Sequence, residues 1–263
     1  MSAASAEFGN DWRQAVRRGQ TQLGMFCSSY SAQTTEVVAG SGIDFLIFDH
    51  EHTPWSWPEL HVQLAVLRAF PVAAVVRVAT LDAAMARQLL DLGVDAVMVA
   101  NVESAAAAQH LVSCLRYAPR GTRGMGGSVR ASRYGRAAPT RASADAQASL
   151  WVQIESRQGL AHARDIAGVD GVDAVFFGPH DLAVDLGYWG QPGHAEVVAA
   201  LQGGVAAVTA LGVTTGILAP VAEVAHWHRH GVRLLASGSD LGLLAQAADR
   251  LVQQGRQQVQ EVT

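Results

Sequence analysis

Short runs of apolar residues recur along this chain and alternate with longer stretches in which the apolar residues are spaced three or four apart. The short runs have the length and composition of buried strands, and the longer stretches have the periodicity of amphipathic helices. Eight strands are predicted, at Leu23–Cys27, Phe45–Phe48, Ala73–Val78, Ala96–Val99, Trp151–Ile154, Ala174–Phe177, Thr215–Leu218 and Leu234–Ala236. Helices are predicted most clearly at Leu81–Leu92, Ser104–Leu115, Glu196–Leu211 and Leu241–Val252.

Strands that alternate with helices are typical of a parallel sheet covered by helices. Eight such pairs close a (β/α)8 TIM barrel, an α/β fold of about 250 residues, and the 263 residues of this chain fit one such domain. We therefore expect a polar N-terminal segment or helix over residues 1–20 and a single barrel over residues 21–263. The same pattern leaves a doubly wound open sheet as the alternative.

One connection is too long for a minimal barrel loop. Residues 116–149 lie between two predicted strands and are rich in glycine and arginine. Connections of this length in a compact domain are usually functional or disordered.

The composition narrows the class of protein. Hydrophobic residues make up 49% of the chain and the net charge is -4, which predicts a folded core and argues against a nucleic-acid partner. The longest apolar runs fall short of the roughly 20 residues of a membrane helix, and residues 1–20 show no signal peptide. Cys27 and Cys114 have no metal-type spacing. We expect a cytoplasmic protein that does not bind membranes.

All 19 basic side chains are arginine, and the sequence contains no lysine. Schiff-base catalysis, pyridoxal-phosphate chemistry and the lysine-bearing phosphate loop all require a lysine amine. These mechanisms are therefore excluded.

Polar and charged side chains gather where the predicted strands end. They are Asp49–His52 after the second strand, Arg77 at the third, Gln153 and Glu155 at the fifth, His180 and Asp181 after the sixth, and Ser237, Ser239 and Asp240 after the eighth. Because the carboxyl ends of barrel strands carry the active site, we expect these side chains to converge. The alternative for the first group is a polar loop whose Asp49 caps the next helix.

Glu155 and Asp181 follow adjacent predicted strands. Two hard carboxylates without cysteine suit Mg²⁺ or Mn²⁺, which bind one or two protein carboxylates and complete their shell with water and substrate oxygens. Each carboxylate could instead pair with an arginine or cap a helix.

The sequence also offers candidates for a general base and for a side chain that binds an anion. His52 is the better base candidate of the two clustered histidines, because imidazole titrates near neutral pH, and Asp91 could orient it. Arg77 ends a buried strand, where its guanidinium needs an anion. The carboxylate or developing enolate of a 2-keto acid would supply that anion, and so would a structural carboxylate.

Seven segments together resemble the motifs of the HpcH/HpaI aldolases, in the order of that family, which comprises metal-dependent class II enzymes acting on pyruvate-type substrates. They are Phe48–Pro54, Val75–Arg77, Arg87–Gly93, Arg116–Gly124, Val152–Glu155, Phe177–Leu182 and Gly216–Pro220. The resemblance spans the chain from Gln22 to about Leu251.

This resemblance implies a set of roles. Glu155 and Asp181 would hold the divalent metal, which is Mg²⁺, Mn²⁺ or Co²⁺. Gln153 and the backbone of Gly178, Pro179 and His180 would bind the keto acid. His52 would be the proton acceptor, made more basic by Asp91, and Arg77 would stabilise the enolate oxygen. The family commonly forms hexamers, so a homo-oligomer is expected, and the C-terminal helix would either dock on a neighbour or close the barrel of its own chain.

Two positions depart from the pattern of the family. His50 stands where glycine is usual, and His180 stands where alanine or serine is usual. The extra imidazoles would alter substrate choice or offer another metal ligand. The segments Leu218–Pro220 and Ser237–Asp240 resemble most closely the branch that acts on ketodeoxy sugar acids, including 5-keto-4-deoxy-glucarate, beside the 4-hydroxy-2-oxoheptanedioate branch.

The sequence thus predicts an aldolase that cleaves or forms a 4-hydroxy-2-keto acid, with pyruvate or hydroxypyruvate as enolate donor and an aldehyde as acceptor. Phe26 and Leu218 would form an apolar rim for the aldehyde, unless both are ordinary core residues. One alternative is a related lyase acting on a CoA thioester or phosphoenolpyruvate, with anion contacts from Arg116–Arg136. The other is a barrel that binds keto acids without catalysis.

Overall fold

A computed structural model of the chain describes residues 11–137 and 148–261. Eight parallel strands close a barrel in which each strand pairs with the next along the chain and β8 pairs with β1. They are β1 (Gln22–Cys27), β2 (Phe45–Asp49), β3 (Ala73–Val78), β4 (Ala96–Val99), β5 (Leu150–Ile154), β6 (Val172–Phe177), β7 (Thr214–Leu218) and β8 (Leu234–Ser239). The closed barrel confirms the predicted fold and excludes the open sheet.

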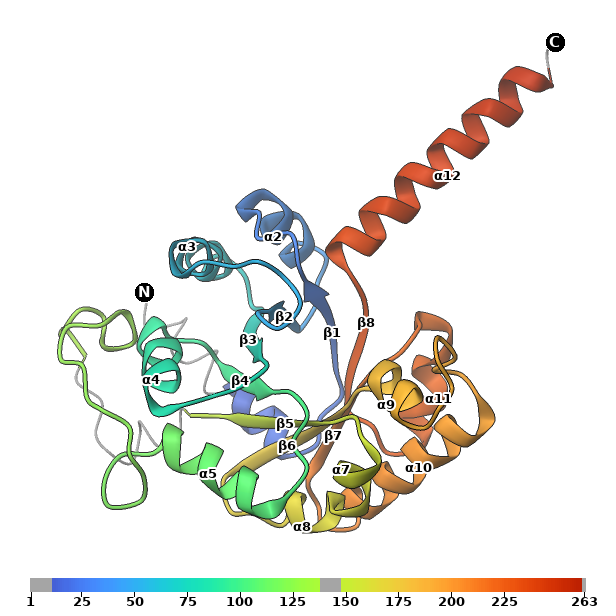
Figure 1. The fold of residues 1–263 in the computed structure, drawn as a ribbon. Coiled ribbons are helices and arrows are strands. Elements are labelled where there is room, and N and C mark those ends of the chain that lie inside the picture. Colours follow the sequence, from blue (N-terminus) through green and yellow to red (C-terminus); the bar gives the residue numbers. More distant parts are fainter. Residues whose placement is uncertain (1–10, 138–147, 262–263) are drawn as a thin grey trace.

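Helices follow the strands and surround the barrel (Figure 1). They are α2 (Ala32–Ala39), α3 (Trp57–Leu67), α4 (Ala83–Leu92), α5 (Ala105–Leu115), α7 (Arg157–Ala161), α8 (Ala163–Ala167), α9 (Pro179–Asp185), α10 (Ala195–Thr209), α11 (Val224–Arg229) and α12 (Asp240–Gln260), with 3-10 turns at Arg130–Ser132 and Val221–Glu223. Several begin at a serine or aspartate that accepts a hydrogen bond from the first turn, as Ser56 and Asp82 do. Within the described residues, no helix is long and apolar enough to span a membrane.

Alternating side chains divide the core into two layers. Along β2, Phe45 and Ile47 belong to the cluster inside the barrel, whereas Leu46 and Phe48 belong to the larger cluster under the helices. This alternation follows from the two-residue period of a strand. Every residue of β2 is buried, which explains why the strand reads as one continuous apolar run.

The N-terminal segment forms part of this core. Residues 11–17 are helical, and their Trp12 stacks on Trp151 of β5 with ring centroids 5.7 Å apart. Val16 is also buried, and its carbonyl accepts a hydrogen bond from the Thr214 hydroxyl. The region predicted as a polar N-terminal segment or helix thus contains a helix that packs against the end of the barrel where the strands begin. Residues 1–10 of that prediction lie outside the described part.

The C-terminal helix leaves the barrel. Figure 1 shows α12 projecting away from the other helices, and Asp240 is its one buried residue. The helix is longer than the predicted Leu241–Val252, and it does not close the barrel of its own chain. β8 also runs past the predicted end at Ala236, because Ser239 still pairs with Phe26.

Candidate active site

An ion pair joins the ends of β2 and β3. Arg77 donates from Nε to Asp49 Oδ1 at 3.0 Å and from Nη2 to Asp49 Oδ2 at 2.8 Å. Burial alone would raise the pKa of Asp49, but the hydrogen bonds and charge of Arg77 hold that pKa below its ordinary value. Asp49 also accepts from the backbone N–H groups of Glu51 and His52. The anion that the buried Arg77 needs is therefore a structural carboxylate, one of the two alternatives that the sequence left open.

Arg77 has two further contacts that fix its position. Its Nη1 lies 3.2 Å from Glu51 Oε2, and its guanidinium carbon lies 4.7 Å from the centre of the Phe26 ring. Phe26 itself belongs to the cluster inside the barrel, against which Leu218 is partly buried. Phe26 is therefore a core residue whose ring also contacts the guanidinium of Arg77.

Glu155 lies at the end of β5 in a strongly negative environment. Burial raises the pKa of Glu155 to about 7, and the charges of Asp181 and Glu51 add to the shift. Its Oε1 accepts from the backbone N–H of Asn101 at 3.0 Å, and its Oε2 accepts from Gln153 Nε2. These two donors hold the carboxylate in place, and the acidic neighbours make it a site for a positive charge.

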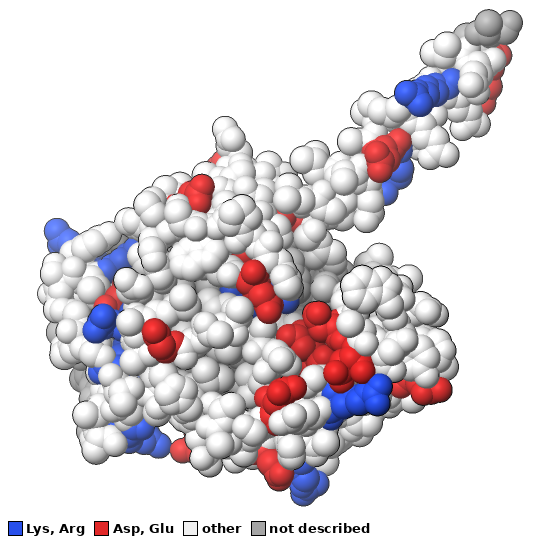
Figure 2. Space-filling view, viewed as in Figure 1, with Lys and Arg blue, Asp and Glu red and all other residues white. Residues whose placement is uncertain are grey.

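The chain after β6 passes directly over this carboxylate. A side chain at Gly178 would clash with Glu155 Oε2 and Gln153 Nε2, so only glycine fits there. Pro179 follows as the first residue of α9, which presents Asp181 from its first turn. His180 and Asp181 are exposed. Figure 2 shows acidic side chains gathered beside the position that α9 occupies in Figure 1.

His52 and Asp91 are not brought together within one chain. His52 is 61% exposed at its side chain, and its Nε2 lies 3.7 Å from Glu51 Oε2. Asp91 stands near the end of α4, which runs back toward the start of the barrel, and it pairs with Arg123 Nη2 at 3.4 Å. The sequence placed the two together because it does not show the direction of α4.

The neighbouring His50 has a different environment. It is 7% exposed and stacks on Trp55 with ring centroids 3.8 Å apart, and Tyr30 packs beside it. Neither ring nitrogen has a hydrogen-bond partner among the described residues. Burial lowers the pKa of His50 to about 3. The imidazole that departs from the family pattern is therefore neutral and packed as an aromatic ring.

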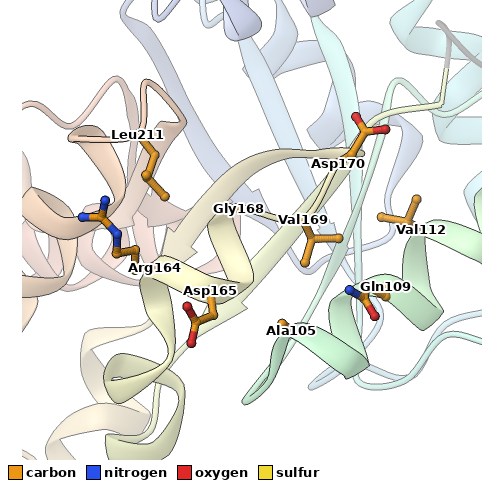
Figure 3. A pocket seen from close by; sticks show the side chains of 9 residues that line it. All are labelled: Ala105, Gln109, Val112, Arg164, Asp165, Gly168, Val169, Asp170 and Leu211. Carbon is orange, nitrogen blue, oxygen red and sulfur yellow. The ribbon is translucent and has the colours of Figure 1, made fainter.

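An arginine-rich connection and a cavity both lie away from Glu155 and Arg77. The connection that begins at Arg116 runs past the ends of α3 and α4, where Arg130 donates to Leu64 O and Leu92 O. Its arginines therefore lie at the opposite end of the barrel, away from a substrate at Glu155. The cavity in Figure 3 lies outside the barrel between α5 and α8, and none of the predicted site residues lines it.

Sequence reasoning gave no role to Asn101. This residue follows β4 with a φ of 47°, in the left-handed region that asparagine tolerates better than most residues. That conformation directs its N–H to Glu155. The sequence signal that could have identified Asn101 is its position as a polar residue at the end of a barrel strand.

Comparisons with known proteins show which proteins this chain resembles. The family model described as HpcH/HpaI aldolase/citrate lyase matches residues 22–247. A hydroxypyruvate/pyruvate aldolase of Delftia acidovorans is 40% identical over 97% of this chain and 94% of its own length. A pyruvate aldolase of Rhizobium etli is 37% identical over 92% of this chain and 96% of its own.

A solved structure shows the same fold over nearly the whole chain. It is an HpcH/HpaI aldolase/citrate lyase family protein from Burkholderia cenocepacia, with a TM-score of 0.89 and 32% identity over 94% of this chain and 99% of that one. This chain therefore resembles these proteins over nearly its whole length.

Proposed function

This chain belongs to the HpcH/HpaI aldolase/citrate lyase family and is an aldolase, and we propose that it cleaves and forms 4-hydroxy-2-keto acids with the help of a divalent metal. Pyruvate or hydroxypyruvate would be the enolate donor and an aldehyde the acceptor. The observation that carries the proposal is the cluster at the strand ends, where the charges of Asp181, Glu51 and Arg77 all act on the buried Glu155 and Arg77 pairs with Glu51.

The residues at this site suit a divalent metal ion. Among the described residues no three histidine, cysteine or acidic side chains lie close enough together to form a complete protein ligand set. Mg²⁺ and Mn²⁺ do not need one, since they keep several waters and bind through one or two carboxylates. Glu155 and Asp181 would hold the ion. When bound, it would act as a Lewis acid on the 2-keto group of the substrate.

Free polar atoms support substrate binding at the same place. Gln153 is 2% exposed, yet its Oε1 has no hydrogen-bond partner within the described chain. A buried carbonyl oxygen without a partner is rare and usually marks a position filled by water or ligand. Gln153, with the backbone from Gly178 to His180, would orient the keto acid beside Glu155.

Arg77 would stabilise the negative charge of the enolate, and His52 would accept the proton of the substrate. The guanidinium of Arg77 is fixed by Asp49, so it can stabilise the developing enolate oxygen without reorganising. His52 is accessible and adjoins Glu51. In cleavage it would accept the proton of the substrate 4-hydroxyl as the bond between C3 and C4 breaks, leaving the enolate and releasing the aldehyde.

An assay of carbon–carbon bond cleavage tests the proposal. The enzyme is mixed with 4-hydroxy-2-oxoheptanedioate and, separately, with a 4,5-dihydroxy-2-keto acid, in the presence of Mg²⁺ or Mn²⁺. Formation of pyruvate and the matching aldehyde is expected. If neither substrate is cleaved, and pyruvate and hydroxypyruvate do not condense with glycolaldehyde, the proposed substrate class is wrong.

The chain would act as a homo-oligomer, by resemblance a hexamer. The support is α12, which projects from the barrel with Leu244 65% exposed and Leu251 72% exposed. These leucines are two helical turns apart and so share one face. A second copy would bury that face, and we propose that in this assembly Asp91 of one chain orients His52 of another.

A further inference from the structure

A cavity of about 530 Å³ lies outside the barrel, far from the strand-end site. It is lined by four arginines, Arg68, Arg130, Arg133 and Arg136, together with His61 and Tyr134. Within residues 11–137 and 148–261, no acidic residue lines it. The cavity lies beside the end of α3 and the turn between α4 and β4, since Arg68 and Arg130 donate to Gly93 O and Leu92 O there.

These four arginines differ in their contacts from the arginines that form ion pairs. Arg13, Arg77 and Arg123 each form an ion pair with an aspartate. Across residues 11–137 and 148–261, by contrast, none of the four cavity arginines pairs with a carboxylate. Since the chain has 23 acidic residues and a net charge of -4, partners of the right charge are not scarce. The cavity therefore retains an excess of positive charge.

The hydrogen bonds of these arginines leave much of their capacity unused. Arg130 uses Nη1 and Nη2 on the carbonyls of Leu92 and Leu64, at 2.6 and 2.9 Å. Arg68 uses Nη2 on Gly93 O, but its buried Nε has no partner in the described chain. A guanidinium has five N–H donors, so each still has donors to offer. Carbonyl contacts anchor these side chains and do not neutralise them.

Charge repulsion within the cavity is visible at Arg130. Burial and the charge of Arg68 together lower the pKa of Arg130 to about 10, although the charges of Tyr134 and Asp95 act in the opposite direction. Arg130 still carries its proton at neutral pH. Two like charges held together in a partly buried place lower the stability of the fold unless an anion lies between them.

We propose that this cavity binds a small molecule that carries two or more phosphate groups. Several guanidiniums around one space require a ligand of dense negative charge, and phosphate oxygens match the planar fork of arginine. A volume of about 530 Å³ exceeds what one ion fills and lies within the range of small-molecule sites. The site is separate from the aldolase chemistry and does not rest on its assignment.

Calorimetric titration of the untagged, assembled protein tests the proposal. Pyrophosphate, ADP and citrate are titrated separately in metal-free buffer at constant ionic strength. Pyrophosphate is expected to bind and to raise the melting temperature in proportion to the logarithm of its concentration. Absence of binding by both pyrophosphate and ADP at about 1 mM, or equal binding of citrate, would overturn the phosphate assignment.

Matched variants locate the binding. The double variant Arg133→Gln, Arg136→Gln should weaken pyrophosphate binding at least tenfold with aldolase activity unchanged, because both arginines line the cavity and neither belongs to the strand-end site. Arg120→Gln with Arg157→Gln changes two arginines outside it and should leave affinity unchanged. If the cavity variant binds as the wild type does, the site is not here. Tighter binding of ADP than pyrophosphate, lost in Tyr134→Ala, identifies a nucleotide, and equal binding identifies the phosphates alone as the recognised group.

Discussion

Arg77 shows most clearly how single residues build the site. Its charge is balanced by Asp49 and Glu51 before any substrate arrives. We therefore propose that Arg77 stabilises charge that develops during the reaction and does not hold the ground-state carboxylate.

Kinetics of Arg77→Ala test that role. We expect turnover to fall about 10²-fold or more, by analogy with removal of an oxyanion donor. The Michaelis constant should change much less. A variant with an unchanged kcat and a raised KM would show that Arg77 binds the substrate carboxylate instead.

The two clustered histidines should differ sharply in function. His52 is exposed beside Glu51, whereas His50 is buried against Trp55 with its pKa lowered to about 3. His52→Ala should nearly abolish deuterium incorporation at pyruvate C3 in D₂O, and His50→Gly should retain it, with some loss of stability from the missing ring stack. An inactive His50→Gly that folds normally, beside an active His52→Ala, would assign the base to His50.

Glu155 should destabilise the metal-free protein at high pH. Burial raises its pKa from 4.5 to about 7, so the folded state favours the protonated form. Stability from this group is full below pH 4.5 and is lost as the pH rises toward 7; the loss is at most about 3 kcal/mol. Glu155→Gln should therefore melt higher than the wild type at pH 8 and equally at pH 4 in metal-free buffer. Equal melting at pH 8 would contradict the buried, negatively crowded site.

At the scale of secondary structure, the sequence predicts the strands well and their contacts poorly. All eight strands are found because each is a buried apolar run, and the fold follows from their alternation with helices. The sequence offered a structural carboxylate for Arg77 without naming Asp49, and it did not predict the bond from Asn101 to Glu155. Periodicity assigns a residue to a face and does not name its partner. The Asp91 prediction did not allow for the direction in which α4 runs.

The sequence pattern also did not predict that α12 projects away from the barrel. Apolar spacing predicts a helix at Leu241–Val252 in either case, whether it packs on its own barrel or on a neighbour. Packing decides between the two, and the structure leaves Leu244 and Leu251 exposed.

Polar substitutions on α12 test whether it joins chains. Leu244→Asp with Leu251→Asp should reduce the molecular mass in solution, since the two charges would be buried in the contact. Gln246→Asp with Gln253→Asp adds the same charge on the other side of the helix and should leave the mass unchanged. Light scattering after gel filtration measures both. If the leucine variant keeps the wild-type mass, α12 does not hold the assembly together.

At the scale of the whole molecule, stability and chemistry lie at opposite ends of the barrel. The N-terminal helix closes the end where the strands begin, with Trp12 stacked on Trp151. The carboxylates, Arg77 and His52 lie where the strands end. This division lets the site carry a crowded set of charges while the apolar interior holds the fold.

We expect the carboxylate pair Glu155 and Asp181 to make the aldolase metal-dependent. The direct test is deuterium incorporation into pyruvate C3 in D₂O, measured by NMR with enzyme that has been stripped by chelator and then dialysed. We expect no exchange in the stripped enzyme, recovery on adding Mg²⁺, Mn²⁺ or Co²⁺, and no recovery in folded Glu155→Gln or Asp181→Asn. Full exchange in the stripped enzyme would show that proton transfer at pyruvate C3 does not need the metal, and would contradict the proposed role of Glu155 and Asp181.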